Sequence, residues 1–191
     1  MPSKPRKESP SGVYHFITRG VNRMKIFHSP GDYCFYLELL AENSRKLGIQ
    51  IYHYCLMSNH AHLLLRAESL ECLSQLGHIT HIRYAYFYSR TRDWSGQVFR
   101  RNFHSLPIPD DIYLLECGRY IERNPIKADL VNHPHEYPYS SYSFYALGKP
   151  NTLITESPFY ANLGNSLCER MAAYRLYVCQ ERDSVPVNSV D

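Results

Sequence analysis

The sequence lacks the features that mark membrane-spanning or secreted proteins. Its 191 residues contain no run of 18 or more apolar residues, so no membrane span is expected. Residues 1–7 are polar and basic, unlike the apolar segment of a signal peptide. The six cysteines form no C-x-x-C pair, so neither a zinc knuckle nor a dithiol redox motif is indicated. We therefore expect a cytoplasmic protein with reduced thiols and no membrane partner.

The net charge of +3 is mild, but the charges are unevenly distributed. Residues 1–25 hold six Lys or Arg against one acid, and residues 83–103 hold five Arg against one Asp, whereas residues 150–191 hold three Arg against five acids. This asymmetry suits a polyanionic partner at one surface, although scattered solvated charge gives the same composition. The 17 Tyr and 8 Phe offer rings either for stacking on bases or for the core.

Hydrophobic periodicity and turn residues divide the chain into strands and helices. Strands are predicted at residues 13–19, 49–56, 60–66 and 98–105, and helices at residues 30–47, 69–90, 110–124 and 166–183. Ser29 and Pro30 indicate the start of the first helix, and Gly48 indicates its end. Gly77 weakens the second helix. In the second strand, strict alternation would place Ile51 on the same face as His53 and Cys55.

The order of these elements predicts an α+β protein. A βαββαβ order followed by a further helix is typical of a ferredoxin-like antiparallel sheet with two helices on one face and a third on the other. We expect this domain at residues 13–147. A flexible basic arm is expected at residues 1–12, and a C-terminal extension of unknown role at residues 148–191.

His60 and His62 are separated by one residue in the third predicted strand. Side chains two apart in a strand leave the same face about 7 Å apart, so two imidazoles can converge on one divalent metal. The alternative is a pair of polar side chains on a solvated strand face. Ala61 and Leu63 would face the two early helices, which leaves the histidines on the side where the later helix can dock.

Tyr120 and Asn124 lie one helical turn apart on that later helix. A phenol has a pKa near 10, so Tyr120 needs a metal that polarises a phosphate in order to attack it at neutral pH. Arg119 and Arg123 could supply positive potential or hold phosphates. Asn124 could be a neutral oxygen ligand for Mg²⁺ or Mn²⁺, or a cap for the turn that begins at Pro125.

Several segments together resemble one protein family. They are residues 13–20, residues 57–64 around the histidine pair, residues 96–103, residues 120–131 around Tyr120, and residues 137–142. In combination they are similar to the single-tyrosine HUH transposases (the IS200-like transposases), and within them to the REP-associated tyrosine transposases. The resemblance covers roughly residues 13–147.

The resemblance implies a metal-dependent endonuclease and strand transferase that acts on single-stranded DNA at repeated palindromic hairpins. Tyr120 would be the nucleophile and form a 5′-phosphotyrosine link, while His60, His62 and Asn124 would hold Mg²⁺ or Mn²⁺. The expected DNA contacts are made by basic residues, namely Arg19, Arg23, Arg100, Arg101, Arg119, Arg123 and Lys127. A monomer is favoured, with a dimer as the alternative.

Two other functions fit parts of the sequence. A non-catalytic module could bind single-stranded nucleic acid through the aromatic residues of the sheet, but such a module needs no histidine pair. A metal-dependent hydrolase could use an activated water, with Tyr120 serving only in packing. Formation of a covalent protein–DNA adduct distinguishes the transposase from both alternatives.

Overall fold

The computed structural model describes residues 6–180. Its first half contains β1 (Val13–Arg19), α1 (Pro30–Lys46), β2 (Gln50–Met57), β3 (His60–Arg66), α2 (Leu70–Arg92) and β4 (His104–Pro107). The second half contains α3 (Asp111–Glu122), α4 (Asn124–Lys127), α5 (Tyr142–Leu147) and α6 (Leu167–Cys179), and 3-10 turns lie at Val21–Arg23, Pro134–Glu136 and Tyr160–Leu163. The strands form an antiparallel sheet in the order β2-β3-β1-β4, which confirms the ferredoxin-like prediction.

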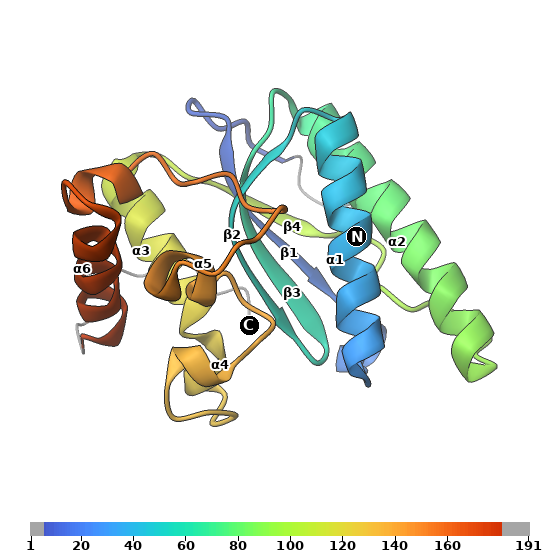
Figure 1. Ribbon diagram of the computed structural model, residues 1–191. Helices are drawn as coiled ribbons and strands as arrows, with labels where there is room; N and C mark the ends of the chain where they lie inside the picture. The colour runs from blue at the N-terminus through green and yellow to red at the C-terminus, as the bar shows by residue number, and fades with distance from the viewer. Residues whose placement is uncertain (1–5, 181–191) are drawn as a thin grey trace.

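The sheet separates two apolar cores. Helices α1 and α2 cover one face, where Phe16 and Leu63 are fully buried (Figure 1). Helix α3 covers the opposite face, and its Cys117 and Ile121 pack with Leu64 of β3. The histidine side of β3 therefore faces α3, as the alternation of the strand predicted.

The first two helices begin and end close to the predicted positions. A capping box formed by Ser29 and Asp32 starts α1, and Gly48 follows its end with a left-handed φ of 64°. Gly77 does not interrupt α2, because it is buried at a close contact. A Cβ at this position would lie 2.9 Å from the ring of Phe103.

The fourth strand differs from its prediction at residues 98–105. Regular pairing is confined to His104–Pro107, although Phe99 forms an isolated bridge with Gly20. The intervening residues leave the ladder, and the ring of Phe103 stacks on Phe16 with a centroid distance of 4.4 Å. The apolar residues that suggested a longer strand are apolar because they pack beneath α2.

A β-bulge interrupts the alternation of β2. Ile51 lies opposite Leu65 and His53 lies opposite Leu64, so Tyr52 is an additional residue in the strand. Ile51 consequently faces α1 and α2, whereas Tyr52 packs in the core beneath α3. The prediction that Ile51 shares a face with His53 and Cys55 is wrong, because the bulge reverses the alternation between them.

The first described residues are held against the body of the protein. Ser9 and Ser11 donate their hydroxyl groups to the carbonyl of Ile108, at 3.2 and 3.1 Å. The guanidinium carbon of Arg6 lies 3.9 Å from the ring centroid of Phe103. The expected flexible arm is therefore docked over residues 6–12, and residues 1–5 lie outside the described part of the chain.

The C-terminal extension forms a third core with α5. Its buried side chains include Tyr145, Tyr160, Tyr174 and Val178. The predicted helix at residues 166–183 is observed as Leu167–Cys179, and residues 181–183 lie outside the described residues.

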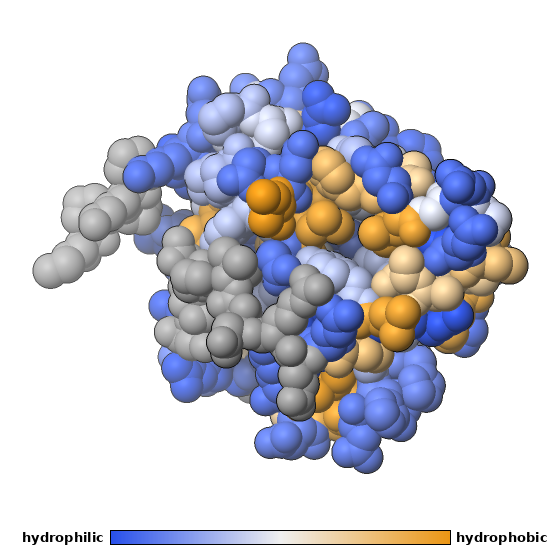
Figure 2. Space-filling model, turned by 90° about the vertical axis from the view of Figure 1, so that its left-hand side faces the viewer, coloured by the Kyte–Doolittle hydropathy of each residue, from blue (hydrophilic) through white to orange (hydrophobic). Residues whose placement is uncertain are grey.

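On the side of the molecule where α3 and α6 lie, hydrophobic side chains are exposed among polar ones (Figure 2). Within residues 6–180, the helices are too short or too polar to cross a membrane.

Candidate active site

The two histidines and the tyrosine meet between the sheet and α3. His60 is half-buried and His62 is buried, and their ring centroids are 4.8 Å apart with nearly perpendicular planes. The ring of Tyr120 lies edge-on to His62 at a centroid distance of 5.9 Å. Residues separated by about 60 positions in the sequence are thus brought together, as the predicted topology required.

Asn124 begins α4, one residue after the C-cap of α3. Its side-chain nitrogen donates to the carbonyls of Tyr120 and Ile121, at 2.9 and 3.2 Å. These bonds add donors to carbonyls in the last turn of α3, where the regular backbone pattern of the helix ends. They also use the amide nitrogen, so the amide oxygen is the atom of Asn124 that is suited to a metal.

His15 is a third histidine at this site, and the sequence analysis did not identify it. Its Nε2 lies 2.9 Å from Nδ1 of His62, and its ring centroid lies 5.9 Å from that of Tyr120. Val13, His15 and Ile17 alternate on one face of β1, so a polar residue between two buried apolar ones was the available signal.

Burial favours the neutral form of His15 and of His62. It lowers the pKa of His15 to about 3. It also lowers the pKa of His62 well below its ordinary value, and the neighbouring His15, His60 and Arg19, which disfavour another positive charge beside them, lower it further. A neutral imidazole is the form that binds a metal, so His62 is in the required state at neutral pH.

The donor set fits an oxygen-preferring divalent ion only in part. His60 and His62 offer nitrogen, and Asn124 offers oxygen. Three or more His, Cys, Asp or Glu side chains do not converge on one point anywhere in residues 6–180. An ion here would complete its coordination with water or phosphate oxygens, as Mg²⁺ and Mn²⁺ commonly do.

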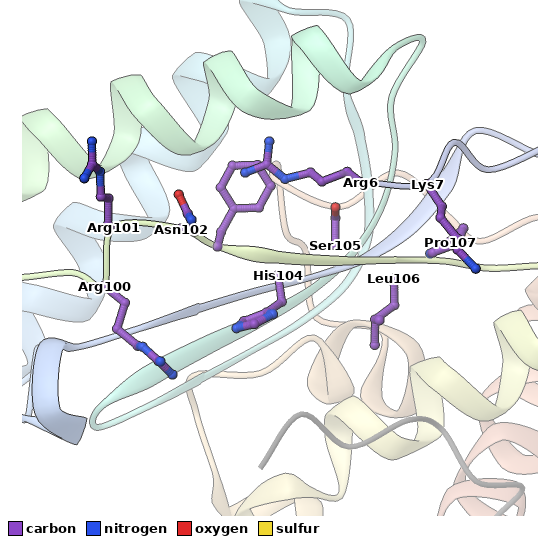
Figure 3. A pocket seen from close by; sticks show the side chains of 10 residues that line it. Arg6, Lys7, Arg100, Arg101, Asn102, His104, Ser105, Leu106 and Pro107 are labelled. Carbon is purple, nitrogen blue, oxygen red and sulfur yellow. The ribbon is translucent and has the colours of Figure 1, made fainter. Parts of the chain in front are cut away.

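Basic residues surround the site and extend along the edge of the sheet. Arg19 is paired with His60 across β1 and β3, so both leave the same face of the sheet. A groove beside β4 is lined by Arg6, Lys7, Arg100, Arg101, Asn102, Phe103, His104, Ser105, Leu106 and Pro107 (Figure 3). Burial lowers the pKa of His104, and the positive charges of Arg100, Arg19 and Arg6 lower it further. The potential at this edge is therefore positive.

The other predicted DNA contacts lie at two places. Arg23 is exposed in the turn after β1, where its carbonyl accepts a hydrogen bond from the Asn59 side chain at 3.2 Å. Lys127 is exposed on α4, and its Nζ lies 4.3 Å from the ring centroid of Tyr120. Both cations are on the surface, and Lys127 is beside the candidate nucleophile.

Arg119 and Arg123 hold a helix instead of facing the open side of the site. Arg119 is buried, and it donates to the carbonyls of Tyr177, at 3.1 Å, and of Gln180. Arg123 donates to the carbonyl of Val178 at 2.8 Å. The last carbonyls of α6 have no intrahelical donor, and the two arginines satisfy them. Both side chains are thus engaged with the end of α6 in the protein without DNA, and the DNA contacts expected of them stay a prediction.

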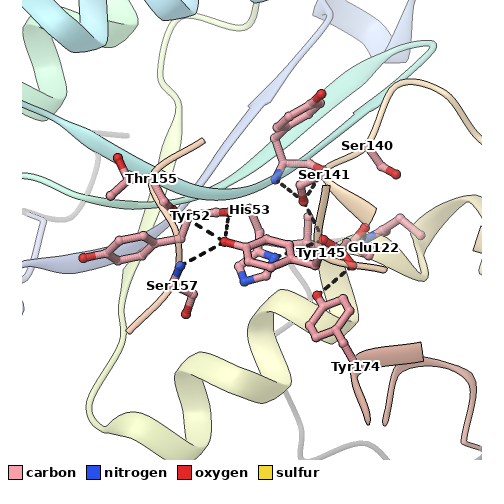
Figure 4. A network of polar contacts seen from close by, with 12 residues as sticks. Tyr52, His53, Glu122, Ser140, Ser141, Tyr145, Thr155, Ser157 and Tyr174 are labelled. Atoms are coloured by element: carbon pink, nitrogen blue, oxygen red, sulfur yellow. Dashed lines mark hydrogen bonds and ion pairs between the residues drawn. The ribbon is translucent and has the colours of Figure 1, made fainter. Parts of the chain in front are cut away.

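A buried carboxylate fixes the end of α3 from the other side. Glu122 accepts hydrogen bonds from His53 (3.0 Å), Ser141 (2.6 Å) and Tyr174 (2.8 Å) (Figure 4). The three donors come from β2, the segment before α5, and α6. Because Glu122 lies between Tyr120 and Asn124 in the sequence, this network positions the turn that carries both. The sequence analysis did not identify it.

Comparison with known proteins identifies the family. Residues 9–124, more than half of the chain, match the family described as "Transposase IS200 like", and the chain belongs to this family. The protein is therefore of the transposase class, whose substrate is DNA. No protein in the curated collections matches the sequence.

Two solved structures are similar to the chain, and the first of them shows the same fold. One is a REP-associated tyrosine transposase bound to a REP hairpin; it is 13% identical, the match covers 82% of this chain and 93% of that one, and the TM-score is 0.62. Another is a candidate transposase from Deinococcus radiodurans R1; it is 18% identical, the match covers 64% of this chain and 97% of that one, and the TM-score is 0.44. The structural match with the REP-associated transposase covers more of this chain than the segment, residues 9–124, that matches the family.

Proposed function

We propose that this transposase is a metal-dependent endonuclease and strand transferase for single-stranded DNA, with Tyr120 as its nucleophile. The observation that carries the proposal is the position of the Tyr120 ring, at 5.9 Å from both His15 and His62 and on the same side of the sheet as His60. A tyrosine that served only in packing would not need a cluster of neutral imidazoles beside it.

The chemistry is a transesterification at phosphorus. The phenol oxygen of Tyr120 forms a bond to the scissile phosphorus, and the phenol proton passes to a base. The bond from phosphorus to the 3′ oxygen breaks, which leaves a 5′-phosphotyrosine and a 3′-hydroxyl that takes up a proton. A divalent ion held by His60, His62 and Asn124 would polarise the phosphate when bound. The ammonium group of Lys127, 4.3 Å from the ring centroid of Tyr120, stabilises negative charge that develops on the phenol oxygen.

The proposed substrate is DNA with a short palindromic hairpin. Two observations support it: the related fold occurs in a transposase bound to a REP hairpin, and the edge of the sheet beside β4 is basic. Arg19, Arg100 and Arg101 would contact the phosphates, and the single strand would continue from them toward Tyr120.

The test is a covalent adduct. Wild-type protein incubated with hairpin-bearing single-stranded DNA and Mn²⁺ should give a protein–DNA band on a denaturing gel, and EDTA should remove it. Tyr120→Phe keeps the ring and removes the attacking oxygen, so the adduct should disappear while DNA binding persists. Tyr113→Phe, on the same helix, is the matched control and should retain the adduct. An adduct formed by Tyr120→Phe would assign the nucleophile to another residue. DNA binding without any adduct in the wild-type protein would favour a non-catalytic binding protein.

A further inference from the structure

The contact between His15 and His62 has a consequence for metal binding. Nε2 of His15 and Nδ1 of His62 are 2.9 Å apart, and both residues are buried. One of these two nitrogen atoms must carry the shared hydrogen. A neutral imidazole carries one N–H, so the direction of this bond determines which nitrogen of His62 has a lone pair.

Only one direction is compatible with metal binding by His62. If His15 donated, Nδ1 of His62 would be the acceptor, and its Nε2 would carry the hydrogen and could not coordinate an ion. If His62 donates from Nδ1, its Nε2 has the lone pair that a ligand needs. His60 follows the same rule, because its Nδ1 lies 2.5 Å from the side-chain oxygen of Asn59, which can only accept.

We propose that His15 is a positioning residue that accepts the Nδ1 hydrogen of His62 and thereby makes Nε2 of His62 the metal-binding atom. This inference rests on the proposed function. A histidine ligand usually donates its other ring nitrogen to a carboxylate or a carbonyl oxygen. Here a buried imidazole takes that place, as the side-chain oxygen of Asn59 does for His60.

A second observation indicates that His15 has a role beyond packing. Nδ1 of His15 is buried and has no hydrogen-bond partner among the described residues. A buried polar atom without a partner destabilises the folded protein, so an apolar side chain would fill the position better if packing were its only role. The hydrogen bond between Nε2 of His15 and Nδ1 of His62 gives a reason for a histidine at this position.

Two substitutions separate the positioning role from a packing role. His15→Gln places an amide oxygen near the position of Nε2 and keeps an acceptor for His62. His15→Leu keeps an apolar side chain of similar length and removes the acceptor. The ring nitrogens of His62 would be assigned by ¹⁵N NMR on metal-free protein, and Mn²⁺ affinity would be measured by electron paramagnetic resonance of the free ion. Thermal unfolding would verify that each variant is folded.

The expected result is an Nδ1–H tautomer of His62 in the wild-type protein and in His15→Gln, and a loss of this preference in His15→Leu. Mn²⁺ affinity should fall by roughly 10–100-fold in His15→Leu and be largely retained in His15→Gln. An Nε2–H tautomer in the wild-type protein, or equal tautomers and affinities in both variants, would overturn the proposal. Wild-type protein that has the Nδ1–H tautomer but binds no Mn²⁺ would contradict the proposed metal-dependent function and still support the assigned direction of the hydrogen bond.

Discussion

The two atoms of the Asn124 side-chain amide can serve different roles. The sequence left open whether this residue caps a turn or binds a metal, and the structure is compatible with both. Its amide nitrogen bonds the carbonyls of Tyr120 and Ile121, as a helix-terminating residue does. Its amide oxygen is the proposed ligand. A substitution can therefore affect stability and metal binding separately, according to which atom it removes.

Replacement of Asn124 should separate these effects. Asn124→Asp keeps an oxygen and adds charge but removes the donors, so we expect a loss of about 1 kcal/mol in the free energy of unfolding with Mn²⁺ affinity retained or increased. Asn124→Ala removes both atoms and should lower both quantities. Chemical denaturation and Mn²⁺ titration of the two variants measure them. A metal titration unchanged in Asn124→Ala would exclude the residue as a ligand.

Buried neutral histidines should make the protein sensitive to acid. Burial lowers the pKa of His81 to about 4, from about 6.5 in an unfolded chain. The unfolded state therefore binds more protons than the folded state between these values. The stabilising contribution is complete above pH 6.5 and is lost as the pH falls toward 4, at up to about 1.4 kcal/mol per pH unit for one such group.

His81→Gln tests this prediction away from the metal site. The amide does not titrate and can still bond the hydroxyl of Thr18, which lies 2.8 Å from Nε2 of His81. The free energy of unfolding, measured with EDTA between pH 5 and 7, should depend less steeply on pH in this variant. His135→Gln changes an exposed histidine and should keep the wild-type slope. Identical slopes in all three proteins would mean that the pKa of His81 is the same in the folded and unfolded states.

At the scale of secondary-structure elements, the contact between α3 and α6 gives a prediction about arginines. Arg119→Ala removes charged hydrogen bonds to carbonyls of α6, so the free energy of unfolding should fall by about 2–3 kcal/mol. The salt dependence of DNA binding should not change. Arg101→Ala, in the groove beside β4, is the matched comparison. It should leave stability within about 0.5 kcal/mol and reduce the salt slope by about 0.7. A reduced salt slope in Arg119→Ala with unchanged stability would instead identify Arg119 as a DNA contact.

The sequence predicted most elements because their side chains follow the period of a helix or a strand. The strands of residues 13–19 and 60–66 were placed correctly, and the face of His60 and His62 followed from alternation. The bulge at Tyr52 could not be predicted, since an additional residue in a strand that is buried on both faces leaves the apolar pattern intact. The fourth strand was misplaced because Phe103 is apolar for packing on α2 and not for pairing.

The proximity of Tyr120 to the histidine pair could be predicted from sequence motifs, whereas contacts that depend on distant partners could not. Tyr120, His60 and His62 form a recognisable pattern. The direction of Arg119 depends on carbonyls about 60 residues away, and charge alone does not reveal it. His15 was missed because its role arises from a contact across two strands with His62.

For the whole molecule, helix α3, which carries Tyr120, depends on residues outside the segment that matches the family. That segment ends at residue 124, whereas α6 supplies partners for Glu122, Arg119 and Arg123. The part of the chain that carries the family pattern therefore leaves several buried polar groups for the C-terminal extension to satisfy.

Removal of α6 should destabilise the entire domain. A chain ending at Lys149 would leave Arg119 without its carbonyl partners and Glu122 without one of its three donors, so we expect the free energy of unfolding to fall by about 2–3 kcal/mol. A chain ending at Gln180 keeps these contacts and is the control. Denaturant unfolding of both chains measures the difference, and equal midpoints would show that α3 does not depend on α6.

The bulge in β2 connects the sheet with α5 and, through it, with the C-terminal extension. The carbonyl of Tyr52 accepts a hydrogen bond from the hydroxyl of Tyr145 at 2.8 Å, and that hydroxyl accepts another from the backbone of Ser157 at 3.1 Å (Figure 4). Deleting Tyr52 would restore regular pairing without turning His53 to the other face, so the additional residue presents its carbonyl to Tyr145 of α5 and does not orient the hairpin that carries His60 and His62. We expect the bulge and the segment of residues 145–157 to occur together in related proteins. A homologue that lacks residues corresponding to 145–157 should have one residue fewer in β2.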